Sequence, residues 1–403
     1  MDRRSRTLLI VLLLAALGVR LGWGLSRPSD EASLAALPDQ NEYVQIARSL
    51  LDGRGLSFYD DSVKQVVYAY RMPGYPLFVA ACGGKVVVVR VVQAVVETTT
   101  VLAVFFLCPL PRTGRGGTGL IAAALVAFNP YLIYFSATVL SETLFTAMLA
   151  WGMFLMVRTN RLAYVSGVIL MALSVYVRPG AIGLPVVLAI GAQLVRVVPS
   201  GRSFWRVPAG TLAIGVLGLA LLPWGLRNRY HEQVGAWVFT TTNGGITLFD
   251  GLNERADGSS DQSWFRRWPE LQSMTEVERS AYFGRQAKQF AMENPDRALW
   301  LGWRKVLRTW SPIPLSAEYG SNRMYVLAGV VFAVPLFVLT VAGLWYGRVS
   351  RSLKLYLLLP AIYFTLVHAV TVGSLRYRVP ADAPMAIVAA IGVATMIGRR
   401  RSG

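Results

Sequence analysis

The chain has 403 residues, a hydrophobic content of 54%, a mean hydropathy of +0.46 and a formal net charge of +18. A soluble domain of this length rarely carries so much apolar surface, and its basic residues punctuate apolar segments instead of forming the single patch typical of nucleic-acid-binding proteins. Apolar segments of roughly membrane length recur from Thr7 to Ile397. They are continuous, so they predict spanning helices and argue against the alternating strands of a barrel.

The expected fold class is mainly α: a polytopic integral membrane protein with about ten transmembrane helices and a small mixed α/β extracytoplasmic region. The predicted spans are 7–25, 86–108, 118–135, 140–157, 162–177, 180–195, 207–224, 324–346, 355–372 and 379–397. Several are short, so tilted or merged spans remain open. Three parts follow from this list. They are an N-terminal membrane module (1–224) with spans one to seven and a first outer loop (26–72), an extracytoplasmic region (225–323), and a C-terminal membrane module (324–403).

Charge predicts the orientation of these spans. Arginines cluster at alternate segment ends, and the clusters are Arg3, Arg4, Arg6, Arg112, Arg115, Arg158, Arg161, Arg196, Arg202, Arg206, Arg348, Arg351, Arg399, Arg400 and Arg401. If every second loop is cytoplasmic, all of them lie inside, together with both termini, as the positive-inside rule requires. Arg20 interrupts the first apolar segment and no clear cleavage site follows, so we expect an uncleaved helix in a plasma (inner) membrane protein.

The first outer loop is expected to contain a helix after Pro38. Its apolar residues fall on one helical face, at Tyr43, Ile46, Ala47, Leu50 and Leu51. Asp39 is placed to cap this helix, and Glu42 three residues later would complete a capping box. The pattern is typical of a surface helix that lies against the membrane.

The second outer stretch carries three further signals. Asn243-Gly244 between β-prone flanks in 237–249 indicates a hairpin. Thr275 with Glu278 indicates the start of a helix that runs to about Asn294. The next segment is basic and tryptophan-rich, which is typical of an interfacial helix, and its apolar residues near one face are Trp300, Trp303, Leu307 and Trp310.

Short motifs dispersed along most of the chain carry a resemblance. They are Asp39 with Tyr43, Ala47, Leu50 and Gly53; Arg71-Met72-Pro73-Gly74-Tyr75-Pro76-Leu77; Asn129-Pro130 and Ser141-Glu142-Thr143-Leu144-Phe145; Arg178-Pro179; Pro223-Trp224-Gly225-Leu226-Arg227-Asn228; and Arg376-Tyr377-Arg378-Val379-Pro380. In this order the motifs resemble the GT-C superfamily of polytopic glycosyltransferases, in its protein mannosyltransferase and lipid A aminoarabinose transferase branch. One departure is Gln40, where family members often carry a second acid. The segment after Tyr75 also looks shorter than usual.

The resemblance implies a glycosyltransferase that uses a polyprenyl-phosphate-linked sugar. It would transfer the sugar, with probable inversion, to a lipid, protein or glycan acceptor on the extracytoplasmic side of the bilayer. A transition state of oxocarbenium character needs a base for the acceptor hydroxyl and cations for the departing phosphate. Asp39 is the candidate catalytic base. The candidate substrate-binding residues are Glu42, Arg71, Tyr75, Glu142, Arg178, Arg376, Tyr377 and Arg378. No cofactor and no metal ligands are expected, although a divalent metal is not excluded.

Structural roles compete with each of these assignments. Asp39 could be a plain helix cap, and Glu42 fits a capping partner better than a ligand. Glu142 opens a span, where a helix N-terminus favours an acid, and it could pair with Arg178. Arginines near Tyr377 could simply anchor the interface, yet cations on the outer side run against the positive-inside trend. The alternative function is a transporter or flippase of lipid-linked sugars, which would favour mid-span polar residues and two related halves.

Overall fold

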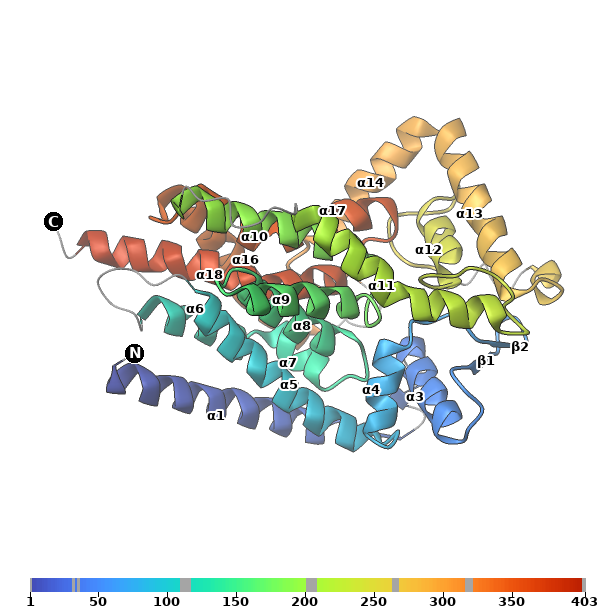
Figure 1. Ribbon diagram of the computed structural model, residues 1–403, viewed down its shortest axis with the longest axis horizontal. Coiled ribbons are helices and arrows are strands. Elements are labelled where there is room, and N and C mark those ends of the chain that lie inside the picture. The colour runs from blue at the N-terminus through green and yellow to red at the C-terminus, as the bar shows by residue number, and fades with distance from the viewer. Residues whose placement is uncertain are drawn as a thin grey trace.

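The computed structural model describes residues 2–30, 33–34, 37–108, 117–200, 209–262, 268–315 and 322–400. Over these residues the chain is a bundle of helices with one two-stranded sheet (Figure 1). Both termini lie at one end of the bundle, and the segments expected outside the membrane lie at the opposite end, called the outer end below. The predicted inner arginines Arg112, Arg115, Arg202, Arg206 and Arg401 lie outside the described residues.

Within the described residues, seven helices are long and apolar enough to cross a membrane. They are α1 (Arg3–Leu25), α5 (Val86–Leu107), α10 (Leu184–Ser200) with the preceding turn η1 (Pro179–Ala181), α11 (Ala209–Tyr230), α16 (Arg323–Tyr346), α17 (Arg351–Val370) and α18 (Leu375–Arg400). An eighth span arises if α6 (Gly117–Ala127) and α7 (Pro130–Ser136), which meet at 53°, form one broken crossing. The chain is thus a multi-pass membrane protein.

The two remaining predicted spans are the apolar helices α8 (Glu142–Met156) and α9 (Arg161–Ser174). They have 15 and 14 residues, fewer than the ~20 that a straight crossing needs. Every predicted span therefore corresponds to a helix or a helix pair, while seven or eight of them have the length of a crossing in the described part of the chain.

Helix α18 runs through the middle of the bundle. In its most apolar window 72% of the residues are buried, against 22% in α1, and α16, α17, α6 and α8 pack around it. Small residues allow this close packing: a Cβ added to Gly392 would lie 2.7 Å from the backbone nitrogen of Gly343 in α16. Because its neighbours fix α18 on several sides, the first turn of this helix is a firm support for the side chains it carries.

The first outer loop contains α3 (Pro38–Leu51), β1 (Phe58–Asp60), β2 (Gln65–Val67) and then α4 (Gly74–Ala81). The two strands are antiparallel, with Phe58 opposite Val67. Helix α3 buries Tyr43, Ile46 and Ala47, so the predicted apolar face is confirmed there. Helix α4 has eight residues and is too short to cross the membrane.

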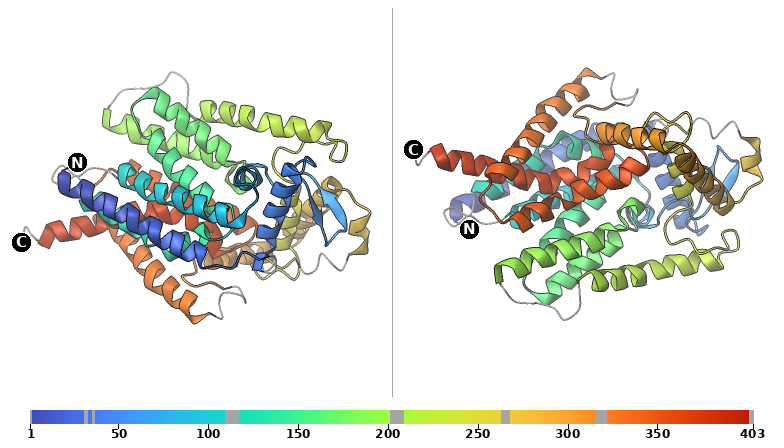
Figure 2. Two further views of the ribbon diagram at one scale, coloured as in Figure 1. Left: turned by 90° about the horizontal axis from the view of Figure 1, so that it is seen from below. Right: turned by 90° about the horizontal axis from the view of Figure 1, so that it is seen from above.

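The second outer stretch contains α12 (Asn243–Gly251), η3 (Pro269–Gln272), α13 (Glu276–Glu293) and α14 (Pro295–Thr309). These segments gather at the outer end in all three views (Figures 1 and 2). The capping box of Thr275 and Glu278 opens α13 as predicted. Helix α14 exposes Trp300 and Trp303, as an interfacial helix would, whereas Trp310 points elsewhere and donates its Nε1–H to the Thr365 hydroxyl at 2.9 Å.

The hairpin predicted across 237–249 is wrong. Asn243 and Gly244 begin helix α12 instead of a turn, and no described residue of this segment is in a strand. Tertiary packing overrides the local signal. A Cβ on Gly245 would lie 1.9 Å from the carbonyl oxygen of Ser280, so α12 and α13 touch backbone to backbone. The described part of residues 225–323 contains helices and no strand, and the sheet lies in 58–67.

Candidate functional site

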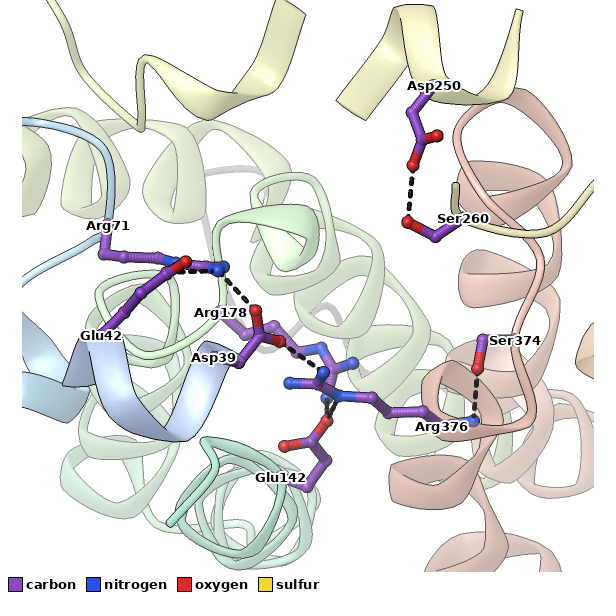
Figure 3. Close-up of polar contacts among 9 residues, drawn as sticks. All are labelled: Asp39, Glu42, Arg71, Glu142, Arg178, Asp250, Ser260, Ser374 and Arg376. Carbon is purple, nitrogen blue, oxygen red and sulfur yellow. Dashed lines mark hydrogen bonds and ion pairs between the residues drawn. The ribbon is translucent and has the colours of Figure 1, made fainter. Parts of the chain in front are cut away.

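Six charged side chains from five separate parts of the chain meet at the outer end of the bundle (Figure 3). They are Asp39 and Glu42 on α3, Arg71 in the segment before α4, Glu142 at the start of α8, Arg178 before η1, and Arg376 in the first turn of α18. We call these six residues the charged cluster. The sequence analysis proposed all six as site residues, and the structure brings them together.

Asp39 lies between two arginines. Arg71 donates from Nη2 to one carboxylate oxygen at 2.5 Å, and Arg376 donates from Nη1 to the other at 2.5 Å. Each arginine also contacts a second acid: Nε of Arg71 donates to Glu42 at 2.6 Å, and Nε of Arg376 donates to Glu142. The cluster is therefore an alternating row of carboxylates and guanidinium groups with Asp39 at its centre.

Glu142 and Arg178 form the buried end of this row. The carboxylate of Glu142 is fully buried, and Nη1 of Arg178 lies 3.7 Å from its Oε1, so the pairing suggested by the sequence is present. Glu142 is also the first residue of α8, where the helix N-terminus favours a negative charge. The open side of the row lies at Asp39 and Arg376, whose side chains are 29% and 27% exposed. A ligand that approaches from outside meets these two groups first.

The capping box predicted for α3 is wrong. The N-cap is Leu37, Pro38 occupies the first turn, and no side chain caps the helix. Asp39 lies inside the first turn and gives both carboxylate oxygens to arginines. The helix begins one residue too early for Asp39 to occupy the N-cap position, and its carboxylate instead pairs with two guanidinium groups.

The two acids on α3 differ in their tendency to ionise. Burial raises the pKa of Asp39, but the charges of Arg71 and Arg376 outweigh it and hold the pKa well below the ordinary 3.8. Burial raises the pKa of Glu42 to about 7; Arg71 opposes this shift and the charge of Asp39 adds to it. Near neutral pH the cluster thus contains an ionised Asp39 next to a Glu42 that exchanges its proton readily.

Two glutamines that the sequence analysis did not assign to the site fix the geometry beneath the cluster. Gln40, next to Asp39, accepts a hydrogen bond from the backbone nitrogen of Val139 at 2.8 Å, three residues before Glu142. Gln93 is fully buried in α5 and donates to the carbonyl oxygen of Thr138 at 2.7 Å. Gln93 could have been found as a polar residue within an apolar segment. The role of Gln40 depends on a contact 99 positions away, which no local pattern reveals.

Tyr75 and Tyr377 pack against residues in and next to the charged cluster. The hydroxyl of Tyr75 donates to Gln93 at 2.5 Å, and its ring meets Tyr43 of α3 edge to face at 4.8 Å between centroids. Tyr377 stacks on His368 at 3.7 Å, and the guanidinium of Arg178 lies 5.3 Å from its ring centroid. Both rings pack against residues of the site, and the hydroxyl of Tyr75 is engaged by Gln93.

Arg378 does not join the cluster, contrary to the expectation that it lines the same cavity as Arg376. Two residues along a helix turn a side chain by about 200°, so the neighbours point apart. Arg378 is 1% exposed, lies 3.5 Å from Asp382, and donates to the carbonyl oxygen of Ser311 at 3.1 Å. Its contacts tie α18 to the end of α14, which is a structural role.

The described residues contain no group of three His, Cys, Asp or Glu side chains that could hold a metal ion. Asp39, Glu42 and Glu142 lie near one another, yet arginines occupy the space between them. Three guanidinium groups bring positive charge to this site, and their geometry suits the planar, paired recognition of phosphate oxygens.

Comparison with known proteins identifies the fold. No protein-family model and no curated protein sequence matches the chain. Among solved structures, it is similar to the Archaeoglobus fulgidus oligosaccharyltransferase tethered with an acceptor peptide, with a TM-score of 0.57, 14% identity, and coverage of 99% of this chain and 50% of that chain. The same enzyme, AglB, in complex with an inhibitory peptide and a dolichol-phosphate has a TM-score of 0.58 and 13% identity, and the match covers 98% of this chain and 51% of that chain. For its apo form the TM-score is 0.55 and the identity 14%, with coverage of 98% of this chain and 51% of that chain.

These similarities show that the chain shares the fold of about half of the archaeal oligosaccharyltransferase chain. The chain spans about half the length of the oligosaccharyltransferase chains it matches. The fold agreement covers nearly the whole of this chain, so the outer segments as well as the membrane helices take part in it.

Proposed function

We propose that this protein is an inverting glycosyltransferase that moves a sugar from a polyprenyl-phosphate donor to an acceptor on the extracytoplasmic side of the membrane. The observation that carries the proposal is the position of Asp39 between Arg71 and Arg376 at the outer ends of the membrane helices. A base and phosphate-binding cations are the two elements that such a transfer requires, and they are adjacent here.

The chemistry assigns a task to each group. Asp39 takes the proton of the acceptor hydroxyl as its oxygen attacks the anomeric carbon of the sugar. The bond between that carbon and the phosphate oxygen breaks, and the electron pair stays on the prenyl phosphate. Arg376, the most exposed guanidinium of the cluster, stabilises this charge, with Arg71 beside it. A single displacement with one base inverts the anomeric centre.

The resting cluster must open for this reaction. Its three carboxylates and three guanidinium groups balance in charge when all are ionised. An arriving phosphate competes with Asp39 for Arg376 and leaves an oxygen of Asp39 free to act as a base. Loss of one guanidinium also raises the basicity of that carboxylate, because the paired cation is what lowers its pKa.

Similar solved structures support the donor and acceptor classes. The archaeal oligosaccharyltransferase was captured with a peptide and with a dolichol-phosphate, so this fold accommodates a prenyl phosphate and an acceptor chain in one protein. For the present chain the acceptor class stays open between lipid, protein and glycan. The proposed location is the plasma (inner) membrane with both termini cytoplasmic; the shared end of the two termini in Figure 1 fits this orientation.

An apolar groove supplies a place for the prenyl chain of the donor. It has a volume of about 510 Å³, and its lining is Trp310, Phe337, Thr340, Val341, Leu358, Ala361, Ile362, Thr365, Leu366 and Met385. These residues belong to α16, α17, α18 and the residue after α14. Met385 lies about 14 Å along the axis of α18 from Arg376, on the face of this helix that also carries Arg378. The guanidinium of Arg378 lies 4.8 Å from the ring centroid of the groove residue Phe337.

Asp39→Asn tests the proposal. The substitution keeps the shape of the side chain and removes its basicity, so transfer should fall by at least about 10²-fold while membrane insertion and prenyl-phosphate binding persist. The matched control is Asp52→Asn, an exposed residue at the end of the same helix. Unchanged product formation by Asp39→Asn would remove Asp39 from the mechanism. If the wild-type protein moved a lipid-linked sugar across vesicle membranes but transferred none of it to an acceptor, that result would favour the transporter alternative.

A further inference from the structure

Glu276 holds the segment that leads to Arg71. It is the first residue of α13, is 6% exposed, and accepts hydrogen bonds from the backbone nitrogens of Tyr68 at 3.0 Å and Ala69 at 3.1 Å. The hydroxyl of Thr242 donates to the same carboxylate at 2.9 Å. Backbone amides two and three residues before Arg71 are thus fixed by one buried acid of the extracytoplasmic region.

Lys305 holds the segment that leads to Arg376. Its side chain is fully buried in α14, and its ammonium group donates to the carbonyl oxygen of Val370 at 2.8 Å, at the end of α17. Only residues 371–374 separate this end from α18. The carbonyl groups at a helix C-terminus lack partners within the helix and attract a cation, so the bond fixes the end of α17.

Glycines on both sides of this contact let the backbones approach each other closely. A Cβ on Gly373 would lie 2.5 Å from the Cα of Lys305, and a Cβ on Gly251 would lie 1.7 Å from the carbonyl oxygen of Thr371. The backbone nitrogen of Gly373 donates to the carbonyl oxygen of Gly258 at 3.0 Å. The loop before Arg376 therefore lies directly against α12, α14 and the residues after α12, with no side chain between the backbones.

Simple docking of two parts of the chain does not require this arrangement. Apolar contacts would join the extracytoplasmic region to the membrane helices at a lower desolvation cost than a buried carboxylate or ammonium group. Directional bonds from buried charges instead fix the position of the backbone they hold. Glu276 and Lys305 each hold a backbone segment that ends within a few residues of an arginine bound to Asp39.

We infer that Glu276 and Lys305 are positioning residues that set Arg71 and Arg376 on either side of Asp39, so that the extracytoplasmic region controls the donor-phosphate site. This inference rests on the proposed function. A shift of about 1 Å in a catalytic group reduces the rate on the order of 10²-fold. An acceptor that moves α12, α13 or α14 acts on the phosphate site through these two contacts.

The test compares Glu276→Gln and Lys305→Met with two matched controls in the full chain in lipid nanodiscs. Glu278→Gln makes the same change two residues away on the exposed side of α13 and keeps a residue suited to the capping box. Arg304→Met removes a cation from the exposed position next to Lys305. Glu276→Asp provides a milder variant should Glu276→Gln reduce the yield of folded protein.

Hydrogen exchange measured by mass spectrometry provides the first readout and needs no substrate. Glu276→Gln should speed exchange in residues 68–71 and leave 371–376 unchanged, and Lys305→Met should do the reverse. Neither control should change either segment. Faster exchange spread over the whole protein would show general destabilisation and overturn the inference.

Binding of farnesyl phosphate provides the second readout, because it does not require catalysis. Each positioning variant should bind about tenfold more weakly, and each effect should vanish when its own arginine is absent. Glu276→Gln should thus have no effect in Arg71→Ala but keep its effect in Arg376→Ala, with the reverse for Lys305→Met. Wild-type binding in both positioning variants, or equal effects in both arginine backgrounds, would overturn the inference.

The proposed function and the positioning inference can be refuted separately. If the wild type binds no farnesyl phosphate, the proposal of a prenyl-phosphate donor is wrong. Hydrogen exchange then decides the positioning inference on its own: local changes at 68–71 and 371–376 support it, and their absence overturns it.

Discussion

Arg376 donates a hydrogen bond to Asp39 at 2.5 Å although 337 positions separate the two residues. The same guanidinium contacts Glu142 through Nε, so one planar group joins α18, α3 and α8. This bridge is what assembles the candidate site from distant parts of the chain. It also makes the shape of the arginine side chain, in addition to its charge, a requirement of the arrangement.

Arg376→Lys should therefore reduce kcat/KM for the donor by about 10²-fold, although the positive charge is kept. A lysine ammonium group is a single point of charge and cannot reach both acids with the spacing of a guanidinium fork. Steady-state transfer kinetics with a prenyl-phosphate sugar measure the effect. Arg54→Lys, at an exposed arginine paired with Asp52, is the control and should behave as the wild type. Equal kinetics for the two variants would mean that the bridge has no catalytic role.

Gln40 is expected to position Asp39 through its bond to Val139. Gln40→Ala removes the side-chain acceptor of the buried backbone amide of Val139, which costs about 1–3 kcal/mol and should reduce both the apparent Tm and the transfer rate. Gln40→Glu keeps an oxygen at the same place and should preserve transfer to within a fewfold of the wild type. Equal losses in the two variants would contradict this role. The pair also tests whether an acid is tolerated next to Asp39.

The membrane helices could be predicted from the sequence because the signal is local. A continuous apolar segment is enough to predict a membrane helix. Charges and motifs at the outer ends of these helices were enough to propose the site residues Asp39, Arg71, Glu142, Arg178 and Arg376. Their mutual contacts required the fold, since partners such as Asp39 and Arg376 lie at opposite ends of the chain.

Three expectations failed, two of them because tertiary contacts took priority over local signals and one because of the period of a helix. Asp39 leaves its expected capping position because two arginines compete for its carboxylate. Asn243-Gly244 enters a helix because α12 packs closely on α13. Arg378 turns away from Arg376 because α18 continues as a helix through both residues. Glu276 and Lys305 were missed because a buried charge in a hydrophilic stretch looks like any exposed charge in the sequence.

Glu42 predicts how stability depends on pH. Its pKa is raised from 4.5 to about 7 in the folded protein, chiefly by burial, so the folded state holds a proton that the unfolded state releases. The stabilisation is fully present below about pH 4.5 and is lost as the pH rises through 7. At ~1.4 kcal/mol per pKa unit it amounts to at most about 3.5 kcal/mol. Glu42→Gln cannot lose a proton, so its apparent Tm should fall less than that of the wild type between pH 5 and pH 8. Parallel Tm curves for the two proteins would show that Glu42 does not titrate in this range.

The apolar groove predicts a chain-length dependence of donor use. Val341 lines the groove in α16, and Val338, one turn earlier, is also exposed but does not line it. Val341→Trp should displace part of a prenyl chain; the loss of contact with two methylene groups, ~1.6 kcal/mol, corresponds to a rise in KM of more than about tenfold. The rise should occur with a long-chain donor and be absent with a donor of one or two isoprene units, whose chain does not reach Val341. Val338→Trp should leave KM unchanged for both donors. If Val341→Trp raised KM equally for the short and the long donor, the effect would lie in the phosphate site, and the groove would not hold the chain.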